Sequence, residues 1–154
     1  MVQNPTGVPE GIAATFFDLV FAGRPTRDWV AAANEVFETG YKESMKASLA
    51  YATPPASPAP PMPTSAYVGT YRNDYVGEAK VTDSNGALFL ELGPAGKRFL
   101  LAPFNRDVFL YSPFAEAPTA RMGVTFVIGP DGKASEVTVE DLNELNLGRL
   151  TRSS

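Results

Sequence analysis

Short apolar or alternating runs, each followed by a turn signal, occupy the last two thirds of this chain. They recur at a spacing of about ten residues and are separated by glycine, proline, asparagine and aspartate, which favour turns. The expected strands lie at 67–72, 76–82, 87–93, 98–103, 107–112, 122–129, 134–140 and 147–152. No helical pattern interrupts the series, so it predicts a mainly β domain of about eight antiparallel strands, either an up-and-down barrel or a sandwich.

Aromatic side chains lie in or beside most of these strands. Small barrels fill their interiors with such side chains, and this is the leading interpretation here. The alternative is a modest pocket formed by part of the aromatic set, because ligand cavities are lined by the same residue types. The candidate ligand-binding residues are Tyr71, Tyr75, Phe99, Phe109 and Phe126.

The first part of the chain has helical rather than strand periodicity. In 10–22 the apolar residues Ile12, Phe16, Leu19 and Val20 share one helix face, which Phe17 and Phe21 widen. Gly23 is the expected C-cap of this helix, and Pro25 prevents its continuation.

A second amphipathic pattern runs from Trp29 to Leu49. Thr26 offers an N-cap oxygen, and Asp28 places a negative charge in the first turn. Gly40 argues against one continuous helix, because glycine destabilises helix interiors. The expectation is therefore one or two helices within residues 1–51.

A proline-rich segment at 52–66 separates the helical region from the strands. Six of its fifteen residues are proline, so it is expected to be an extended polyproline II spacer of intermediate stiffness. A ligand for an SH3-type domain is an alternative interpretation of the same prolines. The predicted organisation is a helical segment at 1–51, a linker at 52–66 and a β-domain at 67–154.

Several kinds of chemistry are excluded or disfavoured by what the chain lacks. It contains no histidine and no cysteine, so it cannot form a Ser-His-Asp or Cys-His catalytic site. It also contains no S-x-x-K motif, which serine hydrolases of the penicillin-binding type require. A zinc site would have to be built from carboxylates alone, which is uncommon, and we expect no metal or cofactor.

The charge and hydropathy patterns disfavour a nucleic-acid partner and a membrane-spanning helix. The net charge is −4, and no basic run is present, which argues against binding to nucleic acid. No apolar stretch reaches the roughly 20 residues that a membrane-spanning helix needs. The N-terminal residues do not have the pattern of an export signal.

Acidic residues form candidate sites that have simpler explanations. Glu78 and Glu91 lie on neighbouring expected strands, and Glu136 and Glu140 alternate along another, as on the solvent face of a sheet. Asp83, Asn85, Asp131 and Glu136 could be read as calcium ligands, but neither stretch has the spacing of an EF-hand loop. Turn formation accounts for these residues.

Several segments together resemble a known module. They are YVGTYRNDYVGEAKV at 67–81, the DSNG turn at 83–86, FLLAPFNRDVFLY at 99–111 and VTFVIGPDGKASEVTVE at 124–140. In these segments the chain resembles the C-terminal β-domain appended to serine hydrolases of the β-lactamase and penicillin-binding type. GVPEGIAATFFDLVFAGRPTRDW at 7–29 is similar to the tail of the catalytic domain in such proteins. The resemblance favours a lipocalin-like barrel over a sandwich.

The Tyr71-Arg72-Asn73 triplet matches the tyrosine-x-asparagine element of class C β-lactamase relatives. No serine nucleophile and no lysine-threonine-glycine segment accompanies it here. We therefore expect the triplet to be structural.

The resemblance implies a non-catalytic accessory domain that supports the assembly or substrate access of a serine hydrolase catalytic domain. That catalytic domain is the expected partner, in cis or in trans, and the setting implied is the periplasm or cell exterior. Because the aromatic helices need a surface to bury against, we also expect self-association through them. The alternatives are a stand-alone barrel that binds a small apolar ligand and, less favoured, an independent enzyme.

Overall fold

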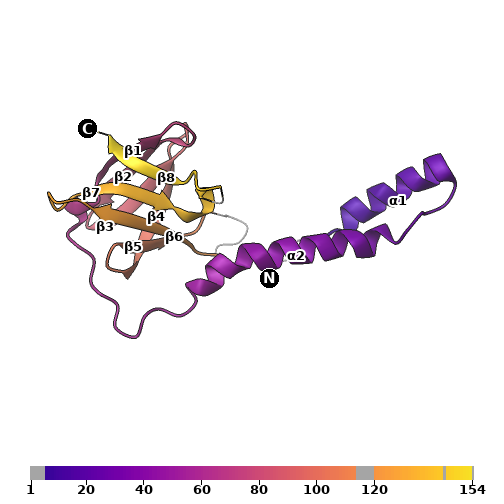
Figure 1. Cartoon of the computed structure of the whole chain (residues 1–154), viewed down its shortest axis with the longest axis horizontal. Coiled ribbons are helices and arrows are strands. Elements are labelled where there is room, and N and C mark those ends of the chain that lie inside the picture. The colour runs from indigo at the N-terminus through magenta and orange to yellow at the C-terminus, as the bar shows by residue number, and fades with distance from the viewer. Residues whose placement is uncertain (1–5, 114–119, 144, 154) are drawn as a thin grey trace. The chain divides into compact units, whose positions relative to one another are not determined.

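The computed structural model of the chain divides into two compact units, Met1–Ala50 and Tyr51–Ser154 (Figure 1). The structure describes residues 6–113, 120–143 and 145–153, apart from the side chains of 43–45 and 47. The first unit is helical, and the second contains all the strands.

The second unit is a closed antiparallel barrel in which each strand pairs with the next and β8 pairs with β1 (Figure 1). Its strands are β1 (Gly69–Asn73), β2 (Gly77–Ser84), β3 (Ala87–Leu92), β4 (Lys97–Asn105), β5 (Val108–Tyr111), β6 (Met122–Ile128), β7 (Ala134–Val139) and β8 (Arg149–Ser153). The expected up-and-down barrel of about eight strands is therefore confirmed, and closure removes the exposed edges of an open sheet.

Alternation and turn chemistry explain these strands. On β3 the side chains of Leu88 and Leu90 are buried inside the barrel, which is the period-two pattern of a half-buried strand. The hairpin between β2 and β3 turns at Asn85 and Gly86, which have φ angles of 55° and 81°. These left-handed values suit the tight hairpin that Asn-Gly predicts.

One end of the barrel is covered by the segment that precedes β1. A 3-10 turn, η1 (Thr64–Ala66), leads into Tyr67, whose side chain is fully buried. We call this end, where Tyr67 and Tyr71 lie beneath η1, the plugged end. The opposite end carries the β1–β2 turn at 74–76, the β3–β4 turn at 93–96 and a second 3-10 turn, η2 (Glu140–Leu142). We call this opposite end the mouth.

The proline-rich segment lies on the barrel rather than apart from it. The Ala59 amide donates to Asn105 Oδ1 at 2.9 Å, and the Arg106 amide donates to the Ala59 carbonyl at 2.8 Å. Just before the segment, the Tyr51 ring packs edge-on against Phe104 with centroids 5.3 Å apart. Residues 59–62 of the segment therefore contact the barrel directly.

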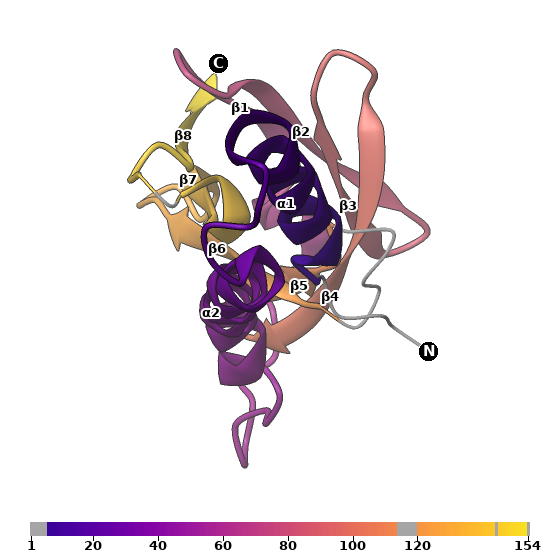
Figure 2. The same ribbon diagram turned by 90° about the vertical axis from the view of Figure 1, so that its right-hand side faces the viewer.

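The first unit is an antiparallel hairpin of α1 (Val8–Ala22) and α2 (Trp29–Ala50), which lie side by side in Figures 1 and 2. Small residues make the contact: a Cβ on Gly11 would lie 2.5 Å from Val30 Cα. The Gly7 amide also donates to Asn34 Oδ1 at 2.9 Å. Glycine on α1 is thus needed for the close approach of the two helices.

Helix caps correct part of the sequence prediction. Gly23 does cap α1, with a φ of 69°. The N-cap of α2 is Asp28, whose Oδ1 accepts from the Ala31 amide at 2.9 Å. Thr26 instead donates its amide and hydroxyl to Asp18. Gly40 does not interrupt α2, which runs unbroken to Ala50.

An apolar stripe on α1 remains exposed. Because the hairpin contact uses glycine and small aliphatic residues, the larger side chains of α1 point elsewhere, and Phe21 is 83% exposed. The stripe consists of Ile12, Phe16, Phe17, Leu19, Val20 and Phe21. Among the described residues, neither helix has the length and hydropathy to cross a membrane.

Candidate functional site

Aromatic rings fill the plugged end of the barrel. Tyr67 contacts Phe109 and Phe126 with ring centroids 5.0 and 4.9 Å apart, and Phe126 lies 6.1 Å from Tyr71. All these side chains are buried. Edge-on aromatic pairs of this kind stabilise a core beyond the area they bury. The plugged end is therefore a packed core.

Arg152 on β8 closes this core with a set of hydrogen bonds. Its Nη2 donates to the Tyr71 hydroxyl at 2.8 Å, and its Nη1 donates to the Val68 carbonyl at 2.9 Å. The Tyr71 hydroxyl in turn donates to the Tyr67 carbonyl at 2.6 Å. Burial raises the pKa of Tyr71 to about 12, although the charge and hydrogen bond of Arg152 oppose the shift. The phenol is therefore a neutral structural group at physiological pH.

Tyr67 connects the same core to the proline-rich segment. Its hydroxyl accepts from the Met62 amide at 2.9 Å and donates to Asp107 Oδ1 at 2.8 Å. Burial is the main cause that raises the pKa of Tyr67 to about 12. One buried hydroxyl thus joins the segment before β1 to the turn between β4 and β5.

The mouth of the barrel contains a mainly apolar pocket of about 460 Å³, which we call the mouth pocket. Tyr75 stands at its edge and is 71% exposed, whereas Tyr111 is only 3% exposed. The Phe99 and Tyr111 rings meet edge-on with centroids 5.3 Å apart. The lining residues are Tyr75, Val76, Leu92, Gly93, Lys97, Phe99, Tyr111, Pro113, Asp141 and Leu142.

A phenol and a carboxyl group form the polar part of the mouth pocket. The Tyr111 hydroxyl donates a hydrogen bond to Asp141 Oδ1. Burial raises the pKa of the Asp141 carboxyl above its ordinary value, although the hydrogen bond from Tyr111 opposes the shift. Burial also raises the pKa of Tyr111, and the hydrogen bond to Asp141 adds to this. The pair can bind or orient a polar group, and no serine, threonine or cysteine is among the residues that line this pocket.

Asn73 fixes the turn that carries Tyr75. Its Oδ1 accepts from the Tyr75 and Val76 amides at 3.1 and 2.6 Å. Its Nδ2 donates to the carbonyls of Leu147 and Arg149 at 2.7 and 2.8 Å. The side chain therefore joins the β1–β2 turn to the start of β8, which explains the tyrosine-x-asparagine triplet as a structural element.

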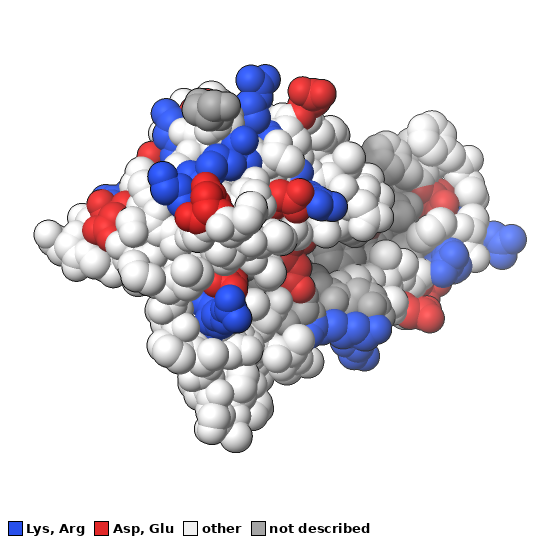
Figure 3. Space-filling view, turned by 60° about the vertical axis from the view of Figure 1, so that its left-hand side comes forward, with Lys and Arg blue, Asp and Glu red and all other residues white. Residues whose placement is uncertain are grey.

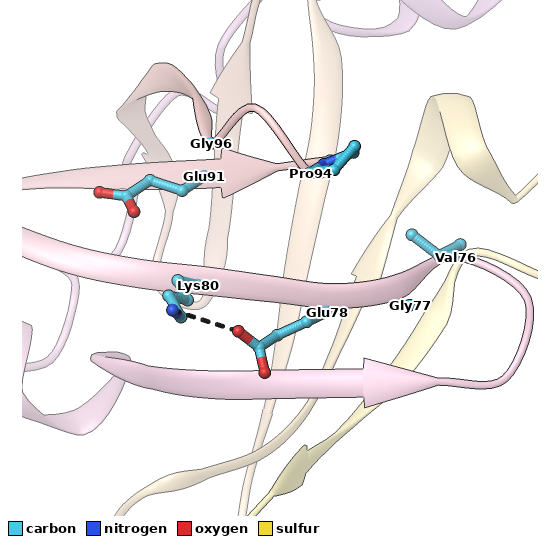
Figure 4. A pocket seen from close by; sticks show the side chains of 8 residues that line it. Val76, Gly77, Glu78, Lys80, Glu91, Pro94 and Gly96 are labelled. Atoms are coloured by element: carbon cyan, nitrogen blue, oxygen red, sulfur yellow. Dashed lines mark ion pairs between the residues drawn. The ribbon is translucent and has the colours of Figure 1, made fainter.

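A second groove, of about 430 Å³, lies beside the mouth on the outer surface of the barrel (Figure 4). Val76 and Gly93 line both this outer groove and the mouth pocket. Lys80 Nζ lies 3.2 Å from Glu78 Oε1, the ion pair drawn in Figure 4. Glu91 accepts from the Thr82 hydroxyl at 3.0 Å. Each of these carboxylates has a partner on the strand surface, so they do not form an acid–base pair.

The other acidic candidates have turn or surface roles. Asp83 Oδ1 accepts from the Gly86 amide, and Asp131 Oδ1 accepts from the Lys133 amide. Glu136 pairs with Arg149, and Glu140 accepts from the Gly123 amide at 2.7 Å. Within the described ranges no group of three or more acidic residues could hold a metal ion.

Charge is mixed over the barrel surface. On the face in Figure 3, basic and acidic side chains of the barrel are interspersed rather than gathered by sign. The ion pairs Arg149–Glu136 and Lys80–Glu78 are two examples. On this face the described residues show no basic stripe of the kind typical of nucleic-acid-binding proteins.

The structure separates the predicted ligand-binding residues into two groups. Tyr71, Phe109 and Phe126 lie in the plugged end, whereas Tyr75 and Phe99 meet at the mouth pocket. Sequence reasoning did not select Lys97, Tyr111 and Asp141 for this site. Tyr111 could have been selected because it is an aromatic residue in an expected strand. No local sequence pattern indicates Asp141 or Lys97, because the fold of the barrel brings them to the mouth.

Comparison with known proteins gives two findings about this fold. The family described as "Domain of unknown function (DUF3471)" matches residues 53–149. The crystal structure of the C-terminal domain of penicillin binding protein Rv0907 is similar, with 35% sequence identity and a TM-score of 0.59. That likeness covers 66% of this chain and 95% of the other.

A further solved structure, described as SurE, is 24% identical, with a TM-score of 0.49, and covers 79% of this chain and 28% of the other. That likeness is too low to bear on fold or function. No curated protein matches the chain.

Proposed function

This chain belongs to the DUF3471 family, and we propose that it is a non-catalytic C-terminal accessory domain of a serine hydrolase related to penicillin-binding proteins. The observation that carries the proposal is the 35% identity with a domain that is itself the C-terminal domain of a penicillin binding protein. Because the likeness spans 95% of that domain, it concerns a whole folding unit rather than a motif.

The residues of the chain support a non-catalytic role. Histidine, cysteine and S-x-x-K are absent from the sequence, so nucleophile activation of the Ser-His, Cys-His and S-x-x-K types has no residues to use. The tyrosines at the plugged end have pKa values raised to about 12, which suits neutral hydrogen-bonding groups rather than general bases near neutral pH.

In this proposal the catalytic domain, in cis or in trans, binds the apolar stripe of α1. The stripe exposes three phenylalanine rings in a row, and Phe17 and Phe21 are stacked with centroids 6.1 Å apart. Exposed apolar surfaces of this kind mark interaction sites. The barrel would then be held near the catalytic domain, where it supports assembly or substrate access.

We also propose that isolated copies of the chain associate through this stripe when no catalytic domain is present. The test is sedimentation velocity over a range of concentrations, which should detect a dimer that dissociates on dilution. Replacing Phe17 and Phe21 together by serine should abolish the dimer. The control is Val127→Ser, which removes a 49%-exposed apolar side chain from the barrel. A monomer at every concentration, or an unchanged dimer in the double variant, would contradict self-association through α1.

The absence of catalysis is tested with acylating probes. The purified chain should not be labelled by fluorescent penicillin or by a fluorophosphonate, and it should not hydrolyse a chromogenic ester. Stoichiometric labelling of one serine would overturn the proposal, because it would reveal an activated nucleophile in this chain.

A further inference from the structure

The Phe99–Tyr111 ring pair is reached from two sides of the barrel wall. The β4–β5 ladder extends only from Ala102 and Leu110 towards the hairpin turn, so β4 before Ala102 is not paired with β5. The two rings span this gap, with the mouth pocket on one side. A groove of about 380 Å³ that includes Arg98 and Arg121 lies on the other. Phe99 and Tyr111 therefore border both the mouth pocket and this groove.

The mouth pocket has the size and lining of a small-molecule site. Its volume of about 460 Å³ lies within the range of ligand pockets, roughly 300–1,000 Å³. Aromatic side chains come from three separate elements, namely the β1–β2 turn, β4 and β5. Because Asn73 makes four hydrogen bonds around the first of these, the backbone that carries Tyr75 is held in place before any ligand binds. A preorganised pocket loses less conformational entropy on binding.

Lys97 is the basic residue in the lining of the mouth pocket. Lys97 Nζ lies 5.1 Å from the centroid of the Phe99 ring, where it can meet a ligand stacked on that ring. Asp141 is the acidic member of the lining, and its carboxyl is already engaged by the Tyr111 hydroxyl.

We propose that the mouth pocket binds a small aromatic carboxylate. The ring of the ligand packs between Tyr75 and the Phe99–Tyr111 pair, and its carboxylate pairs with Lys97 at the rim. The strand aromatics alone suggested a small apolar ligand. The present proposal is more specific, because it names the class of molecule and the end of the barrel that binds it. The inference is independent of the accessory role, because it concerns only the barrel.

The test is a titration of the isotope-labelled chain followed by NMR, with 3-phenylpropionate as the probe and the neutral 3-phenylpropanol as its matched control. The acid should shift the amide resonances of residues that line the mouth pocket, such as Leu92, Phe99 and Leu142. Lys97→Met should weaken binding of the acid about fivefold, the value of one exposed charge pair, and leave the alcohol unaffected. Tyr75→Ala should weaken both, and its 71% exposure makes the change safe for folding.

Lys80→Met is the control for charge, because it removes a lysine from the outer groove, where Lys80 pairs with Glu78. It should leave binding of the acid unchanged. The proposal is overturned if the acid shifts no resonances of the mouth pocket. It is also overturned if the acid and the alcohol bind equally well and Lys97→Met changes the affinity of neither. A loss of acid binding in Lys80→Met as large as that in Lys97→Met would overturn it as well.

Discussion

Arg152 Nη2 donates to the Tyr71 hydroxyl at 2.8 Å, across the seam where β8 closes the barrel onto β1. The two residues are register partners in that ladder, so the backbone pairing and the side-chain contact fix the same alignment. Gly69 is part of this arrangement, because a Cβ there would lie 2.0 Å from Arg152 Nη1. The seam therefore places a half-buried charged side chain against the aromatic core.

Arg152→Met should destabilise the barrel by about 1.5–3 kcal/mol, the range for hydrogen bonds to charged groups, because the Tyr71 hydroxyl and the Val68 carbonyl lose their donors. Arg149→Met is the matched control on the same strand. Its exposed ion pair with Glu136 should contribute only about 0–1 kcal/mol. Denaturant unfolding followed by far-UV circular dichroism measures both. Equal losses in the two variants would show that the seam does not depend on Arg152.

Asn73→Ala should cost about 1–3 kcal/mol, because it leaves the amides of Tyr75 and Val76 and two carbonyls near β8 without their partner. Hydrogen exchange should also become faster at the Tyr75 and Val76 amides. An unchanged unfolding free energy and unchanged exchange would mean that Asn73 does not hold the turn, and the triplet would need another explanation.

Acid should loosen the helical hairpin through Asp18. Hydrogen bonds from Thr26 and Trp29 hold the pKa of the Asp18 carboxyl below its ordinary value. Because this pKa is lower in the folded than in the unfolded chain, the ionised Asp18 stabilises the hairpin at pH values above 3.8, the ordinary pKa. This stabilisation is lost as the pH falls through the folded-state pKa. Trp29, the single tryptophan, reports the change because its Nε1 donates to Asp18 at 2.7 Å.

The fluorescence of Trp29 should therefore change on acidification below about pH 4 in the native chain. In Asp18→Asn the same acid step should be absent. A step of equal size in both chains would assign it to another group.

Asp141→Asn should stabilise the barrel at neutral pH. Because burial raises the pKa of Asp141, the folded state binds its proton more tightly than the unfolded state does. The free energy of unfolding of the native chain therefore falls as the pH rises from 3.8, the ordinary pKa of the group, through the raised pKa of the folded state. The variant, which lacks this titration, should gain most above that range and little below it. A gain in stability that did not depend on pH would contradict the raised pKa of Asp141 as its cause.

Much of the barrel could be predicted from sequence because its signals are local. Alternation such as that of Leu88 and Leu90, and the Asn85-Gly86 turn, each need only a few neighbouring residues. The sequence left open whether Gly40 interrupts the second helix; the helix continues because one glycine costs only about 1 kcal/mol, which the rest of a long helix can offset.

The candidate site was less predictable because it is assembled by closure. Lys97, Tyr111 and Asp141 are distant in sequence, and only the barrel brings them to one mouth. Composition likewise could not indicate that residues 59–62 of the proline-rich segment lie on the barrel. Their contacts are hydrogen bonds to Asn105, Arg106 and Tyr67 that no local pattern encodes.

The central claim is that this chain is an accessory domain of a serine hydrolase, and immunoprecipitation tests it most directly. An antibody against residues 67–154 would recover the native polypeptide and its partners from the source cell, and the precipitate would be treated with fluorescent penicillin and a fluorophosphonate. We predict a labelled serine hydrolase, either as the antigen itself at a mass well above 16.5 kDa or as a second band. An antigen at 16.5 kDa with no labelled protein in the precipitate would contradict the claim.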